Sequence, residues 1–281
     1  MSDTANMIKA WMGTPKFKRR IDEALMGILP GDAFAEQCIM VARDKELSRC
    51  SPDSLLRAFL QCAQLGLMPG PQKMVHLIAR GQAVDVMISA RGYKTLMERL
   101  PSVKRIKAEL VHVRDTFARH DERHDDGRPQ HEYDPFDRSR TFKGIDDLAG
   151  VYLEVRFADG DRDWFFLGAE TVREVRSCSK GWERPTHPWS RWFGAMALKT
   201  VYRQAWNRMF LPAAPDTLNL AIASADKADR LAMDEHYSNA QIHPPNHAPA
   251  PAARALTYDD PAVNEPPQLT VDPEVIVTDK A

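Results

Sequence analysis

The chain has 281 residues, with 38 Lys and Arg against 39 Asp and Glu, and its formal net charge of -1 by itself argues against a nucleic-acid partner. An apolar content of 43% is enough for a sizeable core, yet no apolar run approaches the ~20 residues of a membrane-spanning helix, and no secretion signal is recognisable. Four widely spaced cysteines (Cys38, Cys50, Cys62 and Cys178) indicate neither a disulfide framework nor a thiolate zinc site, so we expect a reduced, cytoplasmic protein.

Apolar residues at helical spacing alternate along the chain with short extended runs bounded by Gly and Pro. In chain order these patterns predict helices over 17–29, 32–46 and 51–66, a hairpin over 74–89, a helix over 92–100, a strand over 103–113, a hairpin over 151–167, and helices over 170–179 and 189–210. In the predicted strand, Ile106 and Ala108 fall on one face and Arg105 and Lys107 on the other. Helices followed by antiparallel hairpins and further helices predict an α+β fold.

Residues 115–147 are polar and show no apolar periodicity, so we expect a long surface loop. His120, His124 and His131 lie in it among several Asp and Glu residues, which is the ligand chemistry of a metal-dependent nuclease. A solvated loop is the favoured interpretation, because nothing in the pattern would hold these side chains on a fixed scaffold. No GxxxxGK[ST] or GxGxxG segment is present, so a function on DNA would not require bound ATP.

Charge and composition divide the chain into two parts. Residues 1–215 carry a net charge of +6, whereas residues 216–236 carry -3 and residues 237–281 carry -4. From Ser238 onward the chain holds eight of its 20 prolines and a single aromatic residue, too little apolar surface to offset the entropy of ordering. We therefore predict one domain over 1–236 and a disordered tail over 237–281. The basic body removes the objection to a nucleic-acid partner.

Basic residues recur at helical spacing near the end of the predicted domain. Arg173 and Arg176 are three residues apart and Lys180 follows four later, while Lys199 and Arg203 stand at i and i+4. Aromatic residues are interleaved with them: Trp182, Trp189, Trp192, Phe193, Tyr202 and Trp206. Cations for phosphates combined with aromatic platforms for bases are typical of proteins that bind single strands. A solvated charged face above core aromatics is the alternative interpretation.

Five segments resemble RecT-type single-strand annealing proteins in family order and spacing. The first is Gln61–Gly70 (QCAQLGLMPG), followed by Ser89–Lys94, Val111–Phe117, Thr171–Lys180 (TVREVRSCSK) and a PW…W…MALKT…LP block over 188–212. The resemblance covers the chain from about residue 17 to Glu235. Met68 and Leu198 depart from the family pattern, and 115–147 diverges from it, so no functional residue is transferred to that stretch.

The resemblance implies an ATP-independent protein of phage or prophage recombination that is not an enzyme and needs neither a cofactor nor a metal. Such proteins coat single-stranded DNA and pair it with a complementary strand, as homo-oligomeric rings or helical filaments. A companion exonuclease and the host single-strand-binding protein are implied partners of the tail, and no membrane is implied. A passive single-strand coating protein and a metal-dependent nuclease are the alternative functions.

We select phosphate contacts from the basic residues of the matched segments and the predicted strand: Arg91, Arg105, Lys107, Arg114, Arg173, Arg176, Lys180, Lys199 and Arg203. Trp189 and Trp192 are expected to anchor the last helix in the core, with stacking on bases as the alternative. Gly66 and Gly70 are expected at a helix end and a turn. The Gln61–Gly70 block is assigned to either a subunit interface or the DNA surface, and both interpretations stay open.

Overall fold

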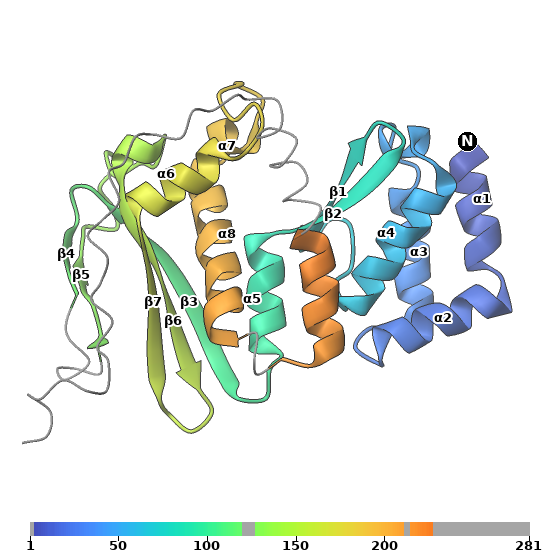
Figure 1. Cartoon of the computed structure of the whole chain (residues 1–281), viewed down its shortest axis with the longest axis horizontal. Coiled ribbons are helices and arrows are strands. Elements are labelled where there is room, and N and C mark those ends of the chain that lie inside the picture. The colour runs from blue at the N-terminus through green and yellow to red at the C-terminus, as the bar shows by residue number, and fades with distance from the viewer. Residues whose placement is uncertain (1–2, 120–126, 211–213, 227–281) are drawn as a thin grey trace, which may run out of the picture. The chain divides into compact units, whose positions relative to one another are not determined.

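The computed structural model describes residues 3–119, 127–210 and 214–226, all within one compact unit that spans Met1–Gln241 (Figure 1). These residues form helices and antiparallel sheets, which confirms the predicted α+β class. The predicted tail over 237–281 lies outside the described residues, and the domain boundary at 236 stays a prediction. None of the helices in the described ranges is long and apolar enough to cross a bilayer.

Helices and one hairpin make up the first hundred residues. Their bounds are α1 (Asp3–Met12), α2 (Pro15–Leu25), α3 (Gly31–Val41), the 3-10 turn η1 (Leu47–Arg49), α4 (Pro52–Gln64), β1 (Val75–Arg80), β2 (Ala83–Ile88) and α5 (Ala90–Glu98). Thr14 and Ser51 begin α2 and α4, because each hydroxyl accepts a hydrogen bond from an N–H of the first turn and a proline follows. Helix α1 was not predicted, because Met7 is an apolar residue on its exposed side and interrupts the helical spacing of apolar and polar residues.

The predicted hairpin of β1 and β2 leads directly into α5. The Ser89 hydroxyl accepts a hydrogen bond from the N–H of Gly92 at 3.1 Å and begins the helix. A side chain at position 92 would clash, because a Cβ there would lie 2.2 Å from the carbonyl oxygen of Met74. Glycine at this position therefore permits the close packing of α5 against the start of the hairpin.

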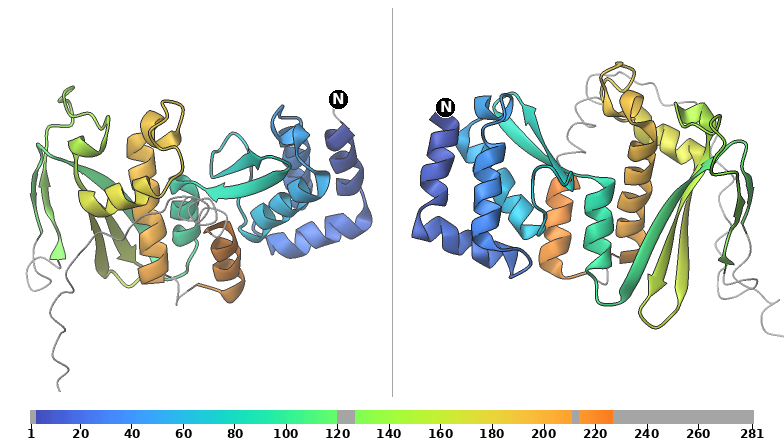
Figure 2. Two further views of the ribbon diagram at one scale, coloured as in Figure 1. Left: turned by 45° about the horizontal axis from the view of Figure 1, so that its top comes forward. Right: turned by 180° about the vertical axis from the view of Figure 1, so that it is seen from behind.

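A three-stranded antiparallel sheet dominates the second half of the described chain. Its elements are β3 (Val103–His112), β4 (Thr116–Ala118), β5 (Gln130–Glu132), the 3-10 turn η3 (Ile145–Asp147), β6 (Leu148–Phe157), β7 (Arg162–Gly168), α6 (Ala169–Ser177), α7 (Pro188–Arg191), α8 (Phe193–Ala205), the π-helical turn η4 (Trp206–Phe210) and helical residues 216–226. The strand order is β3-β6-β7. One face, with Ile106, Leu153 and Leu167, is buried against helices, and α8 lies between the sheet and α5 (Figure 2).

The expectation of a long surface loop over 115–147 is wrong in part, because the described residues of this stretch include paired strands. Strands β4 and β5 pair in this stretch, and they lie over the polar face of the sheet. The ring of Phe117 packs 5.8 Å from the ring of Tyr152 and 6.3 Å from that of Phe166, measured between centroids. A few aromatic contacts between distant segments hold this hairpin, and a periodicity search within the segment cannot detect them.

The single helix expected over 189–210 is interrupted. The backbone of Trp192 is not helical (φ -136°, ψ 50°), and this break separates α7 from α8. Trp189 is buried, as predicted, but Trp192 is 57% exposed, so the expectation that it anchors the core is wrong. Trp206, at the end of α8, is completely buried and takes the anchoring role.

Candidate nucleic-acid interface

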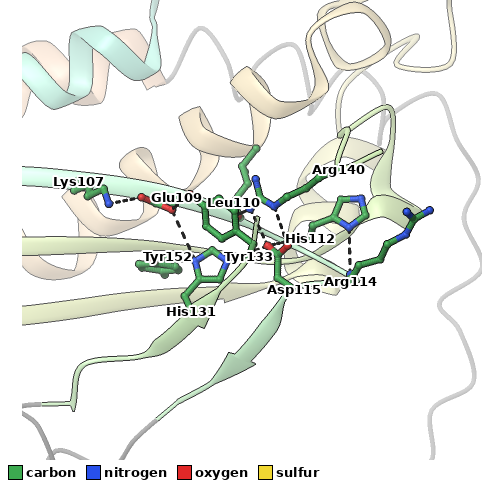
Figure 3. A network of polar contacts seen from close by, with 10 residues as sticks. All are labelled: Lys107, Glu109, Leu110, His112, Arg114, Asp115, His131, Tyr133, Arg140 and Tyr152. Carbon is green, nitrogen blue, oxygen red and sulfur yellow. Dashed lines mark hydrogen bonds and ion pairs between the residues drawn. The ribbon is translucent and has the colours of Figure 1, made fainter. Parts of the chain in front are cut away.

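A buried polar network joins the β4–β5 hairpin to the sheet (Figure 3). Asp115 accepts hydrogen bonds from Arg140 Nε at 2.8 Å, from Arg140 Nη2 at 2.7 Å, and from the backbone N–H of His112 at 2.8 Å. His131 donates from Nε2 to the same carboxylate at 2.9 Å, and its Nδ1 forms a hydrogen bond with the Tyr152 hydroxyl at 3.1 Å. The carboxylate of Asp115 is thereby held by Arg140 and His131, which come from other parts of the segment, and by the nearby backbone of His112.

The electrostatics of the network point to structure rather than to chemistry on a substrate. Burial alone would raise the pKa of Asp115, but the hydrogen bonds from Arg140, His131 and the backbone of His112 together hold that pKa well below its usual range. Burial and the charge of Glu109 raise the pKa of Tyr152, which disfavours its phenolate as a nucleophile. The described residues contain no group of three or more His, Cys, Asp or Glu side chains that could hold a metal.

The polar face of the sheet carries basic residues that become neighbours through strand register. Arg105 on β3 pairs with Arg156 on β6, and Arg156 pairs with Arg162 on β7, so three arginines stand side by side across the sheet. In the next row that shares this face, Lys107 stands opposite Glu154, and Glu154 opposite Trp164. Arginines beside an aromatic ring provide charge for phosphates and a platform for bases.

These rows line an open groove of about 700 Å³ between the sheet and β5, which we call the strand-face groove. Its basic residues are Lys107, Arg128, Arg156 and Arg162, and its aromatic residues are Tyr133, Tyr152 and Trp164. Three glutamates also line it, and Glu154 accepts from Arg156 at 2.7 Å and lies 3.8 Å from Arg162. The groove is therefore mixed in charge, with a modest excess of cations.

A second basic region, the α6–α7 surface, comprises Arg173, Arg176, Lys180, Trp182, Arg191 and Trp192. The guanidinium of Arg176 lies 4.2 Å from the ring centroid of Trp182, and its Nε is buried without a hydrogen-bond partner among the described residues. Burial, followed by the charge of Arg173, lowers the pKa of Arg176. Because this Nε is shielded from solvent, a phosphate can reach Arg176 only through the part of the half-buried side chain that stays accessible.

The rest of the α6–α7 surface is more accessible. Lys180 is exposed, and the Arg191 guanidinium lies 5.0 Å from the ring centroid of the exposed Trp192. Arg173 forms ion pairs with two carboxylates, Glu170 at 3.2 Å and Asp146 at 3.6 Å. These are surface ion pairs, so they compete only weakly with a phosphate.

A third basic group, which we call the hairpin-base cluster, consists of Lys73, His76, Arg91 and Lys199. These residues come from the first strand of the hairpin and the segment before it, from α5 and from α8. Arg91 is exposed and donates from Nη1 to the carbonyl oxygen of Gln72 at 3.2 Å. Burial lowers the pKa of His76, and the nearby positive charges of Lys199 and Lys73 lower it further. Lys199 belongs to this cluster but is only 7% exposed, so its contact with phosphate stays a prediction.

The two remaining predicted contacts have partners within the chain. Arg114 is exposed and donates to the Ser139 hydroxyl at 2.7 Å. Arg203 lies 3.3 Å from Asp226, which also accepts a 2.6 Å hydrogen bond from the Tyr93 hydroxyl. The Arg203–Asp226–Tyr93 contacts tie α8 and α5 to helical residues 216–226. A role for Arg203 in binding DNA stays a prediction.

The nine predicted cations thus occupy several environments rather than a single helix face. Sequence reasoning missed the additional groove residues Arg128, Arg156, Arg162 and Trp164. Arg156 and Arg162 had a detectable signal, because a hairpin turn at 158–161 places them opposite each other. Arg128 had none, since it lies in the stretch without apolar periodicity. His120 and His124, considered as metal ligands, lie outside the described residues.

Comparison with known proteins identifies relatives of the chain. The sequence model of the RecT family matches residues 32–237, a stretch that includes all three basic regions. Protein RecT of Escherichia coli (strain K12) is 26% identical over 229 residues, which cover 75% of this chain and 78% of that protein.

Proposed function

The chain belongs to the RecT family, and from this we propose that it anneals complementary single strands of DNA during recombination, without ATP and without reading their sequence. It acts as a homo-oligomer, a ring or a helical filament, in the cytoplasm of a bacterial host. The observation that carries the proposal is the family match across nearly the whole described chain. The acidic tail serves protein partners such as an exonuclease or the host single-strand-binding protein.

The physical problem of annealing supports an extended basic surface. Two polyanionic strands repel each other, so the protein must neutralise phosphates while leaving base edges free to test complementarity. We assign the primary contacts to Arg91 of the hairpin-base cluster and to Arg176 and Lys180 of the α6–α7 surface. Helix α8 contacts α5, α6 and α7, so it connects the two regions. The exposure of Arg91 and Lys180 supports this assignment.

The other predicted cations have secondary roles in this proposal. Arg173 adds charge to the α6–α7 surface, and Arg105 and Lys107 add charge to the strand-face groove. Arg114 contributes charge at the exposed turn that it holds, while Lys199 and Arg203 contribute charge from largely buried positions. The strand-face groove accommodates a strand through Arg156, Arg162 and the ring of Trp164. Because the groove also contains glutamates, we expect it to bind more weakly than the α6–α7 surface.

The deciding experiment mixes complementary oligonucleotides with the full chain in the absence of ATP and follows duplex formation. Acceleration over the protein-free rate is expected. Retention of single strands without acceleration would identify a passive coating protein. Cleavage that requires a divalent metal and disappears in His124→Ala would identify a nuclease and overturn the proposal.

The surface assignment has its own test. Arg176→Ala and Lys180→Ala are each expected to weaken binding to any sequence and to reduce the slope of log K against log salt by ~0.7, the value for one phosphate on a single strand. Arg19→Ala is the matched control, because Arg19 is an exposed cation on α2 that pairs with Glu23 at 3.7 Å. Equal effects from all three variants would show that only net charge matters and would refute the assigned surface.

A further inference from the structure

One aromatic side chain outside the basic regions is displayed to solvent on an ordered turn. Phe136 is 88% exposed, although the backbone around it is fixed. Asp134 accepts a hydrogen bond from the N–H of Phe136 at 2.8 Å, and Asp137 accepts from the N–H and hydroxyl of Ser139 at 2.8 and 2.7 Å. The turn therefore presents an aromatic ring between two carboxylates.

This turn is also anchored to the body of the protein. Arg114 donates to the Ser139 hydroxyl, and the guanidinium of Arg140 lies 3.7 Å from the ring centroid of Tyr133 while it binds Asp115. Residues on both sides of Phe136 are thus held by the buried network. A large apolar side chain kept exposed by such a support is typical of an interface anchor, because little ordering entropy remains to be lost on binding.

A pocket elsewhere on the chain has complementary chemistry. It has a volume of about 520 Å³ and lies among α2, α4 and helical residues 216–226. Apolar atoms come from Ala24 and Leu60, and the cations are Arg20 and Arg57. One carboxylate, that of Glu23, also lines the pocket, and it lies 3.7 Å from Arg19 outside it, so the charged lining is cationic by one residue. Among the described residues, neither arginine forms an ion pair, although Arg57 Nε donates to the backbone carbonyl of Asp53 at 3.4 Å. The pocket can therefore accept an acidic group without breaking an existing pair.

Two further residues lining this pocket, Gln61 and Gln64, belong to the sequence block whose role was left open between a subunit interface and DNA. We propose that the pocket receives the Phe136 turn of a second copy of this chain. Phe136 packs on Leu60 and Ala24, while Asp134 and Asp137 approach Arg20 and Arg57. On this assignment Gln61–Gly70 serves the subunit interface.

The two surfaces belong to different segments, so the contact is head-to-tail. Each subunit keeps one free turn and one free pocket, and repetition of such a contact forms a ring or a helical filament. The inference rests on the proposed function only in that an annealing protein must hold adjacent subunits along one strand. Its chemistry is independent of DNA: an aromatic ring between carboxylates faces a pocket in which Ala24 and Leu60 lie beside two arginines.

Self-association of the full chain, measured by sedimentation velocity over a wide concentration range, tests the proposal. Phe136→Ala is expected to raise the dissociation constant about 10- to 100-fold, the effect of removing one buried aromatic anchor. Met40→Ala is the matched control, since Met40 is a large apolar residue that is 63% exposed on α3. Arg57→Glu is expected to weaken association as Phe136→Ala does, and Asp137→Arg in the same chain should restore part of it.

Mixing variants tests the head-to-tail geometry. Phe136→Ala keeps an intact pocket and Arg57→Glu keeps an intact turn. The mixture is therefore expected to form dimers, and no assemblies larger than dimers. Unchanged association of Phe136→Ala, an equal loss in Met40→Ala, or a wild-type chain that stays monomeric with and without DNA would each overturn the interface. Binding of a short oligonucleotide by single subunits should be unchanged in Phe136→Ala. Absence of that binding in the wild-type chain would instead refute the proposed function.

Discussion

Replacement of Asp115 by Asn tests whether the buried network is what holds the β4–β5 hairpin on the sheet. The side chain of Asp115 is 2% exposed, and its carboxylate accepts two bonds from Arg140, one from His131 and one from the backbone. Asn keeps the shape but removes the charge, which leaves Arg140 buried beside a neutral amide. Removing one partner of a buried pair typically costs about 3–5 kcal/mol, and because Arg140 also donates to the Leu110 carbonyl we expect about 3 kcal/mol.

Equilibrium unfolding in urea, together with hydrogen exchange of the β4 and β5 amides, measures this loss globally and locally. Asp137→Asn is the control, because Asp137 lies on an exposed turn of the same segment and its replacement should leave stability nearly unchanged. A loss below about 1 kcal/mol for Asp115→Asn, or equal losses for both variants, would show that the network does not carry the hairpin.

The same variant should change how stability depends on pH. The folded pKa of Asp115 is depressed, so its contribution is fully present above the unfolded value of about 4 and is lost as pH falls toward the folded pKa. The difference between wild type and Asp115→Asn should therefore be constant from neutral pH down to about 5 and shrink below about 4. A difference that stays constant through acid pH would refute the electrostatic account of this site.

Three further predictions concern other parts of the chain. Gly92→Ala should cost about 2–4 kcal/mol in urea unfolding, because its Cβ would lie 2.2 Å from the Met74 carbonyl oxygen; an unchanged midpoint would show that α5 can shift freely. Trp192→Ala should leave stability nearly unchanged but weaken single-strand binding by about 1–3 kcal/mol in a fluorescence titration, whereas unaltered affinity would remove Trp192 from the binding surface. A thiol reagent at mildly alkaline pH should modify Cys178 first, because burial raises the pKa of Cys62 to about 12 and also raises the pKa values of Cys38 and Cys50. Rapid modification of all four thiols would contradict this burial.

Local signals predicted much of the fold. Turn residues and alternation identified both long hairpins, and the apolar and charged sides of the β3 strand are those expected from Ile106 and Lys107. A helix start at Ser51 and the sequence Arg91-Gly92 also correspond to structural boundaries. These features depend on interactions within a few residues, which periodicity and capping describe well.

The candidate site was harder to predict because it depends on contacts between distant segments. The i,i+4 spacing of Lys199 and Arg203 placed them on one helix face, but spacing alone does not show whether solvent or another helix covers that face. Helix α5 and Asp226 occupy part of it. The same limit applies to His131, whose partner Asp115 lies 16 residues earlier in a stretch without periodicity.

The row of arginines across the sheet has a consequence for the DNA-free protein. Like charges directly opposite each other on neighbouring strands are destabilising, and Glu154 compensates only Arg156 and Arg162. Arg105 has no ion-pair partner among the described residues, so its repulsion of Arg156 is relieved only by ions from solution. Salt should consequently stabilise the free fold by screening this repulsion. On the proposed function, a bound strand would supply the same screening through its phosphates, and folding and strand binding would then be coupled through the same three side chains.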